Sequence, residues 1–221
     1  MKGLIAIDGP AGAGKSTVAR LLAKKLSYLY IDTGAMYRAI TYFLVKEGIH
    51  YEDLEALNQA LGKINLDLKV IDGVSVIFLN GKQCNEEIRQ TIVNQHVSPV
   101  AKISVVRHFL KKKQRDLAQS TFSVTEGRDI GTVVLPDADL KIFLTARPEV
   151  RAQRRWKELK EKGVDISYSE VLENVTQRDT IDSTRSEAPL RPAVDALLVD
   201  TSDMSIEEVV NFLYQKVVED E

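Results

Sequence analysis

The chain has 221 residues, 44% of them hydrophobic and 28% charged, with a formal net charge of −2. These values are typical of a soluble globular protein with one large domain, or with a core domain and a small insertion. They exclude an overall basic field for nucleic acid or anionic membrane, and the single cysteine, Cys84, excludes an internal disulfide framework. No secretory signal is recognisable and no apolar run approaches the ~20 residues that span a bilayer. We therefore expect a cytoplasmic protein that binds neither nucleic acid nor membrane.

The first elements in chain order are a strand, a glycine-rich loop and a helix. Residues 3–8 (GLIAID) are apolar and β-branched, and residues 15–26 (KSTVARLLAKKL) place apolar side chains at helical spacing. A second short strand is expected over residues 28–32, followed by a helix from about residue 35 to residue 46. This order predicts the start of a βα unit.

The middle of the chain has a different pattern. Residues 66–82 alternate apolar and polar side chains around Asp72–Gly73 and finish at Asn80–Gly81, a pattern that predicts a hairpin or a small antiparallel sheet. Two helices are expected next, over residues 85–97 and 100–119. We predict that residues from about 63 to 100 are an insertion between two βα units of the core.

Strands and helices alternate again in the last hundred residues. Buried-type strands are expected over residues 122–127, 139–146 and 196–202, with helices over 148–161 and 205–218. The last helix begins with Ser205 and Glu208 at the spacing of a capping box. Strands alternating with helices predict an α/β fold with a parallel sheet covered on both faces, and the five expected strands make that sheet five-stranded.

Between the first strand and the first helix lies the pattern G-x-x-x-x-G-K-[ST]. Glycine lets backbone N–H groups approach phosphate oxygens, and the following helix N-terminus favours negative charge. Lys15 can reach the β- and γ-phosphates, and the Ser16 hydroxyl can ligate Mg²⁺. The predicted triphosphate site comprises Gly9, Pro10, Ala11, Gly12, Ala13, Gly14, Lys15, Ser16 and Thr17.

A phosphate-binding loop alone fits switches, motors and kinases. The chain has no N-K-x-D run for guanine, and the apolar strand at 139–146 ends in Thr145–Ala146 rather than in the Asp-Glu of motor ATPases. Eight of the thirteen arginines lie between residues 128 and 191, and arginines neutralise the charge of a moving phosphoryl group. A solvated basic helix face is the alternative explanation for Arg151, Arg154 and Arg155, which are spaced three to four residues apart. Beside the glycine loop, the arginines favour a kinase.

Three further segments are candidates for the acceptor side. They are IDTGAMYR at residues 31–38, EGRDIGT at 126–132 and RDTIDSTR at 178–185. The first two segments lie at the carboxyl ends of expected strands, and an α/β sheet binds its ligands at those ends. Arginines combined with two carboxylates suit an anionic acceptor that also has hydrogen-bond donors, and a nucleoside monophosphate has both.

With these segments the whole chain closely resembles the bacterial cytidylate kinases, which phosphorylate CMP and dCMP. The resemblance rests on IDGPAGAGKST, DTGAMYR, EGRDIGTVV, KIFLTA and RDTIDSTRSEAPL, and on the long insertion before GRDIGT. It implies a P-loop kinase core over residues 1–62 and 101–221, an acceptor-binding insertion over about 63–100, and a helical lid over about 147–163. ATP and Mg²⁺ are the implied donor and metal, CMP and dCMP the implied substrates, and a monomer the expected state.

The resemblance also implies a role for individual residues. Thr33, Arg38 and Arg128 would hold the acceptor phosphate, and Asp129 would accept a hydrogen bond from the cytosine amino group. Arg185 would contact the phosphates during transfer, and one of the three arginines of the lid would reach the reacting group. The implied substrate-binding residues are Thr33, Tyr37, Arg38, Ser98, Arg107, Arg128, Asp129, Arg178, Asp182 and Arg185. The implied catalytic residues are Lys15, Arg128, Arg151, Arg154, Arg155 and Arg185.

Two other readings remain open at this stage. One is another small-molecule P-loop kinase, with UMP or shikimate as the acceptor. The shikimate kinases share the core, but their second strand ends in D-[ST]-D where this chain has Asp32-Thr33-Gly34. A non-catalytic nucleotide-binding regulator would need only the glycine loop. None of His50, His96 and His108 lies in a motif, and an anionic acceptor oxygen needs no strong general base.

Overall fold

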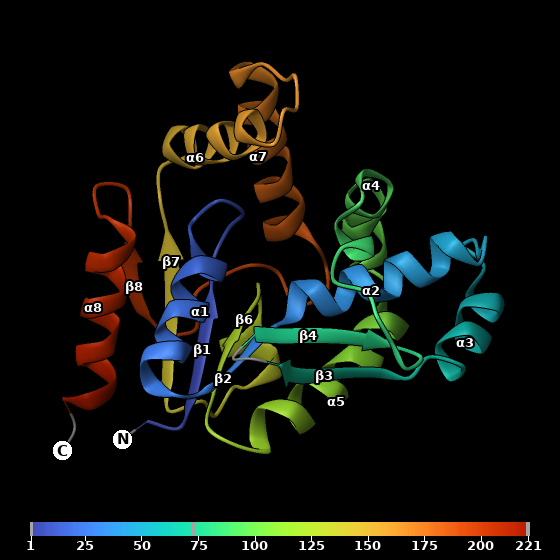
Figure 1. The fold of residues 1–221 in the computed structure, drawn as a ribbon, viewed down its shortest axis with the longest axis horizontal. Coiled ribbons are helices and arrows are strands. Elements are labelled where there is room, and N and C mark those ends of the chain that lie inside the picture. The colour runs from blue at the N-terminus through green and yellow to red at the C-terminus, as the bar shows by residue number, and fades with distance from the viewer. Residues whose placement is uncertain (1, 72–73, 220–221) are drawn as a thin grey trace.

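The computed structural model describes residues 2–71 and 74–219 (Figure 1). Its centre is a five-stranded sheet in the order β2-β6-β1-β7-β8, and every neighbouring pair is parallel. The strands are β1 (Leu4–Asp8), β2 (Leu29–Asp32), β6 (Ser123–Glu126), β7 (Leu140–Thr145) and β8 (Leu197–Asp200). The predicted parallel sheet is therefore confirmed.

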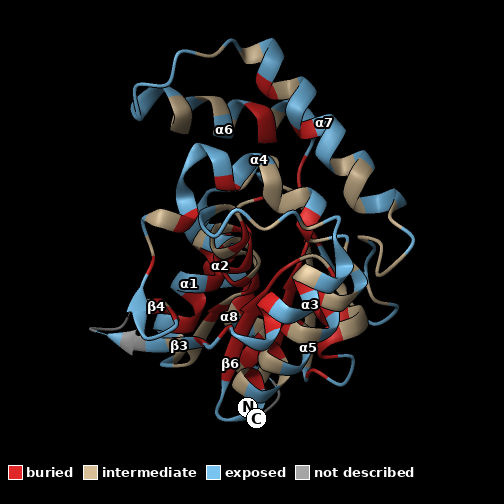
Figure 2. Cartoon of the chain, turned by 90° about the vertical axis from the view of Figure 1, so that its right-hand side faces the viewer, coloured by how far each residue is buried: buried red, intermediate tan, exposed pale blue. Residues whose placement is uncertain are grey.

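Helices cover both faces of this sheet because successive side chains of each strand point to opposite sides. On β1, Ile5 and Ile7 pack in a cluster with α1 (Lys15–Leu26) and α8 (Ile206–Val218). Ala6 faces the other side, where the cluster includes residues of α2 (Thr33–Lys46) and α5 (Ser104–Gln119). Figure 2 shows the buried residues concentrated between these layers.

The carboxyl ends of the parallel strands meet at one edge of the sheet. The chain turns to opposite sides after β1, since β6 and β2 lie beside it in one direction and β7 and β8 in the other. Open α/β sheets bind ligands at such a switch point. Two helices, α6 (Pro148–Glu161) and α7 (Tyr168–Thr184), lie above this edge (Figure 1).

The middle of the chain forms a separate antiparallel sheet of β3 (Leu66–Ile71), β4 (Val74–Leu79) and β5 (Lys82–Gln83). Asn80 and Gly81 both have positive φ, as a tight hairpin turn requires, whereas the predicted turn at Asp72–Gly73 lies outside the described residues. A 3₁₀ turn (Glu87–Arg89) and α4 (Thr91–Val100) follow. The predicted hairpin is present.

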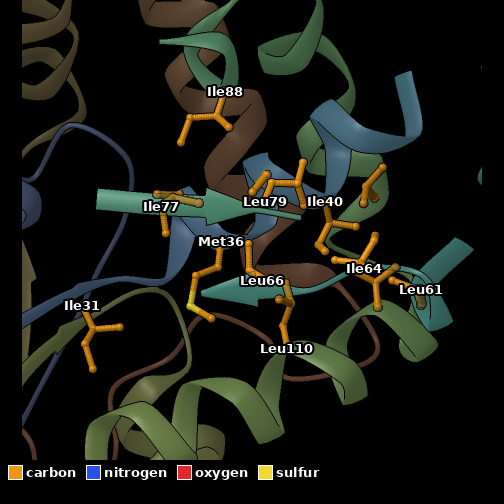
Figure 3. Packing of buried hydrophobic residues seen from close by; sticks show 14 of the residues in the cluster. Ile31, Met36, Ile40, Leu61, Ile64, Leu66, Ile77, Leu79, Ile88 and Leu110 are labelled. Atoms are coloured by element: carbon orange, nitrogen blue, oxygen red, sulfur yellow. The ribbon is translucent and has the colours of Figure 1, made fainter. Parts of the chain in front are cut away.

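This inserted sheet shares its core with the rest of the protein. Ile77, Leu79 and Ile88 pack in the same buried cluster as Met36 and Ile40 of α2 (Figure 3). Because this cluster contains residues of both the insertion and α2, the inserted sheet is packed directly against α2. The boundaries of about 63 and 100 stay a prediction.

Several helices differ from the sequence-based expectation. The prediction omitted α3 (Leu54–Gly62), which Asp53 caps through Glu55 N and Ala56 N, and it omitted α7. Helix α2 begins at Thr33 rather than near residue 35, because the Asp32 side chain accepts from Ala35 N and caps the helix there. Helix α4 begins at Thr91 and α5 at Ser104, both later than expected.

Helices α6 and α7 form a unit with a small hydrophobic cluster of its own. Ala152 of α6 packs with Val171 and Val175 of α7, and Trp156 lies against them. The segment predicted as a lid, 147–163, is thus one half of a two-helix unit. The other half, α7, contains residues 178–184 of the RDTIDSTR segment. Among the described residues, no helix is long and apolar enough to cross a membrane.

Candidate active site

The glycine loop joins β1 to α1 with backbone angles that favour glycine. Gly9, Gly12 and Gly14 have φ values of 146°, 77° and 88°, and Gly14 caps α1 in the left-handed conformation. A Cβ on Gly9 would lie 1.9 Å from the carbonyl oxygen of Leu144, and one on Gly12 would lie 3.0 Å from the Cβ of Arg151. Strand β7 and helix α6 therefore hold the loop at a distance that only glycine allows.

Lys15 is buried in this loop. Its Nζ donates to the carbonyl oxygen of Pro10 at 2.7 Å, and the residue is 5% exposed. Burial lowers the pKa of Lys15, the charge of Arg128 adds to that effect, and Glu126 and Asp8 oppose it. A buried ammonium group held by one carbonyl gains an additional partner when a phosphate enters the loop.

The carboxylate of Glu126 lies near the hydroxyl of Ser16 at the start of α1, and the charge of Asp32 acts on Glu126. Tyr30 Oη donates to Glu126 Oε1 at 2.7 Å. Burial raises the pKa of Glu126, as does the charge of Asp32, whereas Lys15 and hydrogen bonds from Ser16 and Tyr30 lower it. Oxygen ligands of this kind suit Mg²⁺, and the exposed Ser16 leaves room for the water that Mg²⁺ keeps. The residues present therefore fit the metal that a triphosphate carries.

Asp129 lies between two guanidinium groups. Its Oδ2 accepts from Arg107 Nη2 at 2.5 Å and its Oδ1 from Arg185 Nη2 at 3.4 Å, and all three side chains are buried. The Arg107 guanidinium carbon lies 5.9 Å from the centre of the Tyr37 ring, and burial raises the pKa of Tyr37 to about 12. The structure thus brings together four predicted substrate-binding residues from α2, α5, the turn after β6 and the end of α7.

Further arginines gather beside this group. Arg128 Nε donates to Asp182 at 2.9 Å, and Arg38 Nη2 donates to Asp32 at 3.1 Å. Burial lowers the pKa of Arg178, and the nearby charges of Arg128, Arg38 and Arg155 contribute. The Nε atoms of Arg38 and Arg107 are buried without a hydrogen bond among the described residues, although Arg107 Nε lies 3.8 Å from Glu187 Oε1. Positive groups that repel one another and keep unbonded N–H donors favour an anionic ligand.

The three arginines of α6 have different surroundings. Arg151 is buried and donates to the carbonyl oxygens of Ala146 and Ala11 and to both carboxylate oxygens of Asp179. Arg154 donates to the hydroxyl and the carbonyl oxygen of Thr201.

Arg155 is 44% exposed at its side chain and bonds only to Glu158, its neighbour on α6, among the described residues. Of the three, Arg155 is therefore the most weakly held by other side chains and backbone groups.

Other predicted residues are placed as follows. Thr33 is buried and donates to the carbonyl oxygen of Glu126 at 2.7 Å, which ties the start of α2 to the end of β6. Ser98 lies half-buried on α4, and no hydrogen bond among the described residues joins it to the Asp129 group.

The sequence-based prediction missed buried polar residues at the site. Asp8 and Glu126 are buried at the ends of β1 and β6, and Gln114 of α5 lines a cavity with Asp129. Tyr30, within β2, is half-buried and donates to Glu126. Asp8 directly precedes the glycine pattern and Glu126 the GRDIGT segment, so an acidic residue at each strand end was the available signal.

Comparison with known proteins gives one consistent family. Residues 5–219 match the family model described as cytidylate kinase. The chain is 50% identical over 215 residues to a cytidylate kinase of Caldicellulosiruptor saccharolyticus. The aligned region covers 97% of this chain and 93% of that relative. It is 53% identical over 213 residues to a cytidylate kinase of Caldanaerobacter subterraneus subsp. tengcongensis, with 96% and 93% covered.

A solved structure supports the fold independently. An uncharacterized protein from Eubacterium ventriosum superposes with a TM-score of 0.54 over 98% of both chains, at 13% sequence identity. At that identity the likeness concerns the fold alone.

Proposed function

Because the chain belongs to the cytidylate kinase family, we propose that it transfers the γ-phosphoryl group of ATP to CMP or dCMP, giving ADP and CDP or dCDP in pyrimidine nucleotide metabolism. The observation that carries this proposal is the Asp129 carboxylate, held between Arg107 and Arg185 in the turn that follows β6. A donor loop beside a carboxylate and a set of arginines can accommodate two nucleotides with their phosphates facing each other.

On the donor side, the loop Gly9–Thr17 would bind the triphosphate of ATP. Its positive-φ glycines and the N-terminus of α1 supply the phosphate contacts, and Lys15 exchanges its bond to Pro10 O for the β- and γ-phosphates. Ser16 would ligate Mg²⁺, with the carboxylates of Asp32 and Glu126 nearby. When bound, Mg²⁺ neutralises charge that develops on the transferring group.

On the acceptor side, Asp129 would accept a hydrogen bond from the cytosine amino group. Uracil carries a carbonyl oxygen at that position, and a carboxylate offers it no donor. Arg107, beside Asp129, would donate to the acceptor atoms of the base, with Ser98 as a further contact from α4. Specificity for cytosine would then follow from a mismatch of hydrogen-bonding groups, which discriminates better than shape alone.

The acceptor phosphate would bind to Thr33, Arg38 and Arg128. Arg178 and Asp182 would contact the sugar hydroxyls, and Arg185 the phosphates during transfer. The unpartnered Nε of Arg38 and the lowered pKa of Arg178 support an anion in this position.

For the lid, we assign the mobile role to Arg155. Its charge already acts on Arg178, and it has the loosest attachment of the three arginines. Arg151 would keep its bonds to Ala11 O and Asp179 and hold the glycine loop against α7. Arg154 would remain bonded to Thr201.

The reaction would proceed by in-line attack of a CMP phosphate oxygen on the γ-phosphorus. That oxygen is anionic near neutral pH, so positioning, charge neutralisation and exclusion of water account for the catalysis. Closure of α6 and α7 over the donor would exclude water and suppress hydrolysis of ATP. We further propose that the protein acts as a monomer in the cytoplasm. Light scattering of the purified chain tests the monomeric state.

An acceptor panel tests the proposed activity. MgATP is supplied with CMP, dCMP, UMP, AMP or shikimate, and ADP formation is followed by a coupled assay. We expect ADP formation with CMP and dCMP to exceed that with each other acceptor by about a hundredfold, as a hydrogen-bond mismatch at a buried group predicts. Turnover with UMP or shikimate but not with CMP would contradict the proposal, and tight ATP binding without any turnover would indicate a regulator.

A further inference from the structure

Asp8 is a buried carboxylate for which the proposed reaction gives no role. It is the last residue of β1, directly before Gly9, and it is 4% exposed. Its Oδ1 accepts from the backbone N–H of Ile130 at 2.8 Å, and its Oδ2 accepts from that of Gly131 at 2.7 Å. Both oxygens therefore bind a segment 122 and 123 positions away in the chain.

The two donors belong to the first turn of a short π-helix, Ile130–Val134. The residue before it, Asp129, makes no cap with its own side chain. The first N–H groups of a helix lack partners within the helix, and a negative charge at that end is favourable. Asp8 thus caps this helix from β1, the strand next to β6, which leaves the Asp129 side chain to face Arg107 and Arg185.

The turn between β6 and this helix is fixed at both ends to β1. Gly127 N donates to the carbonyl oxygen of Ile7 at 3.0 Å, and Asp8 takes the N–H groups on the other side of the turn. Only Arg128 and Asp129 lie between these attachments. These are the residues proposed to contact the acceptor phosphate and the cytosine amino group.

We propose that Asp8 is a positioning residue for the acceptor nucleotide: its carboxylate holds the Arg128–Asp129 turn in register with the glycine loop. The inference rests on the proposed function, because it concerns the affinity for CMP. Asp8 is one residue from the donor loop and bonds to the acceptor turn, so a single side chain sets the relative position of the two halves of the site.

A merely structural cap would raise the stability of the protein, and Asp8 does not fit that description. Burial raises the pKa of Asp8 to about 6 despite its two backbone hydrogen bonds; the charge of Asp129 adds to the shift and that of Lys15 opposes it. Above that pH the buried charge is a cost to the folded state. Asparagine removes this charge but accepts from only one of the two N–H groups, so the two effects on stability oppose each other. Substitution should therefore separate positioning from stability.

The test compares Asp8→Asn with a control at Asp139, which directly precedes β7 and contacts the other end of β1. Asp139 accepts from the backbone N–H groups of Gly3 and Leu4 at 2.9 and 2.8 Å, at the opposite end of β1 from the site. Asp139→Asn removes an exposed carboxylate that also accepts two backbone N–H groups, both at Oδ2, far from the proposed nucleotides. Binding of CMP and of ADP is measured by calorimetry at pH 8 for both variants and the wild type, together with the melting temperature.

For Asp8→Asn we expect the Kd for CMP to rise about 10- to 100-fold, as misplacement of a contact by about 1 Å does, with the Kd for ADP within about threefold. The melting temperature should stay close to that of the wild type, because removal of the buried charge offsets the N–H group that the amide leaves unbonded. The Asp139→Asn variant should bind both nucleotides like the wild type.

Each other outcome has a separate meaning. Equal losses for CMP and ADP, or unchanged CMP affinity, would overturn the inference, as would an Asp8→Asn chain that fails to fold at pH 8. To separate a steric effect of the amide from loss of the cap, Asp8→Ser is measured in parallel and should weaken CMP binding in the same direction; a wild-type Kd for CMP would also overturn the inference. If the wild type itself does not bind CMP, the proposed acceptor is wrong.

Discussion

The different surroundings of Arg151 and Arg155 predict that alanine at residue 151 lowers stability, whereas alanine at residue 155 lowers kcat. Truncating Arg151 leaves the carbonyl oxygens of Ala146 and Ala11 and the carboxylate of Asp179 without their donor. Breaking a buried ion pair by removing one partner costs about 3–5 kcal/mol. Because the Asp179 side chain is 28% exposed, the lower end, about 3 kcal/mol, applies. For a chain of this length, that loss lowers the melting temperature by about 6–12 °C.

Truncating Arg155 should leave stability almost unchanged. Its pair with Glu158 is exposed on both sides, and such pairs contribute about 0–1 kcal/mol. If its guanidinium group moves to the transferring phosphoryl group, kcat falls about 10²- to 10³-fold, as the loss of one group that stabilises transition-state charge predicts.

Two assays decide between these roles. Thermal unfolding gives the melting temperature of each variant, and the coupled ADP assay at saturating ATP and CMP gives kcat, at a temperature where both variants are folded. Arg154→Ala serves as the matched control from the same helix. A near-normal kcat for Arg155→Ala, together with a large loss of kcat at unchanged stability for Arg151→Ala, would refute the reasoning.

Four further outcomes follow from the site. Asp129→Ala should raise the KM for CMP about 10- to 150-fold, the value of a hydrogen bond to a charged group, and leave that for ATP within about threefold; equal increases would contradict its role. Lys15→Ala should lower kcat about 10²- to 10³-fold in the coupled assay, and a normal rate would exclude its contact with the γ-phosphate. Gly9→Ala should cost about 3 kcal/mol or more in denaturant unfolding, because its Cβ would lie 1.9 Å from the Leu144 carbonyl oxygen at a φ of 146°; a wild-type midpoint would contradict this. Relative to Asp8→Asn, the wild type should lose about 3 kcal/mol of unfolding free energy as pH rises from about 4 to about 6. The reason is that the folded chain keeps the Asp8 proton to about pH 6, whereas the unfolded chain releases it near 3.8. Denaturant unfolding at several pH values measures this slope, and a difference that does not change with pH would contradict the raised pKa.

The local part of this structure could be predicted because its signals are local. The glycine pattern lies between an apolar strand and an amphipathic helix, and the structure has β1, the loop and α1 within one residue of the predicted bounds. Asn80–Gly81 predicted a tight turn, and both residues adopt positive φ. In each case residues adjacent in the chain determine the conformation.

Helix α7 was missed although a signal existed. Ser167 and Glu170 form a capping box of the same kind as Ser205 and Glu208, which correctly predicted α8. The difference is the apolar face: within α7 only Val171 and Val175 are fully buried, because the helix packs mainly on α6 and otherwise faces solvent and the site. Hydrophobic periodicity is weak where a helix buries so little.

The pairings within the site lie beyond sequence patterns. Arg107 was predicted only by resemblance, and its bond to Asp129 spans 22 positions; the bond from Ile130 N to Asp8 spans 122. No periodicity or motif connects such distant residues. Their meeting depends on the strand order, which places β6 beside β1.

The two halves of the site are held by different means, and this decides what each nucleotide must change on binding. The donor loop is fixed by backbone conformation and by Arg151 on Ala11 O, so ATP enters a cradle that is already formed. The proposed acceptor residues instead bond to one another, Arg128 to Asp182 and Arg185 to Asp129. If CMP takes the arginines through its phosphate, each carboxylate is released for a donor on the same ligand: a sugar hydroxyl for Asp182 and the cytosine amino group for Asp129. A phosphate without the matching donors would leave the half-buried Asp182 without its arginine and Asp129 with Arg107 alone, which costs free energy. Selectivity for the whole nucleotide over its separate parts therefore follows from this exchange of partners.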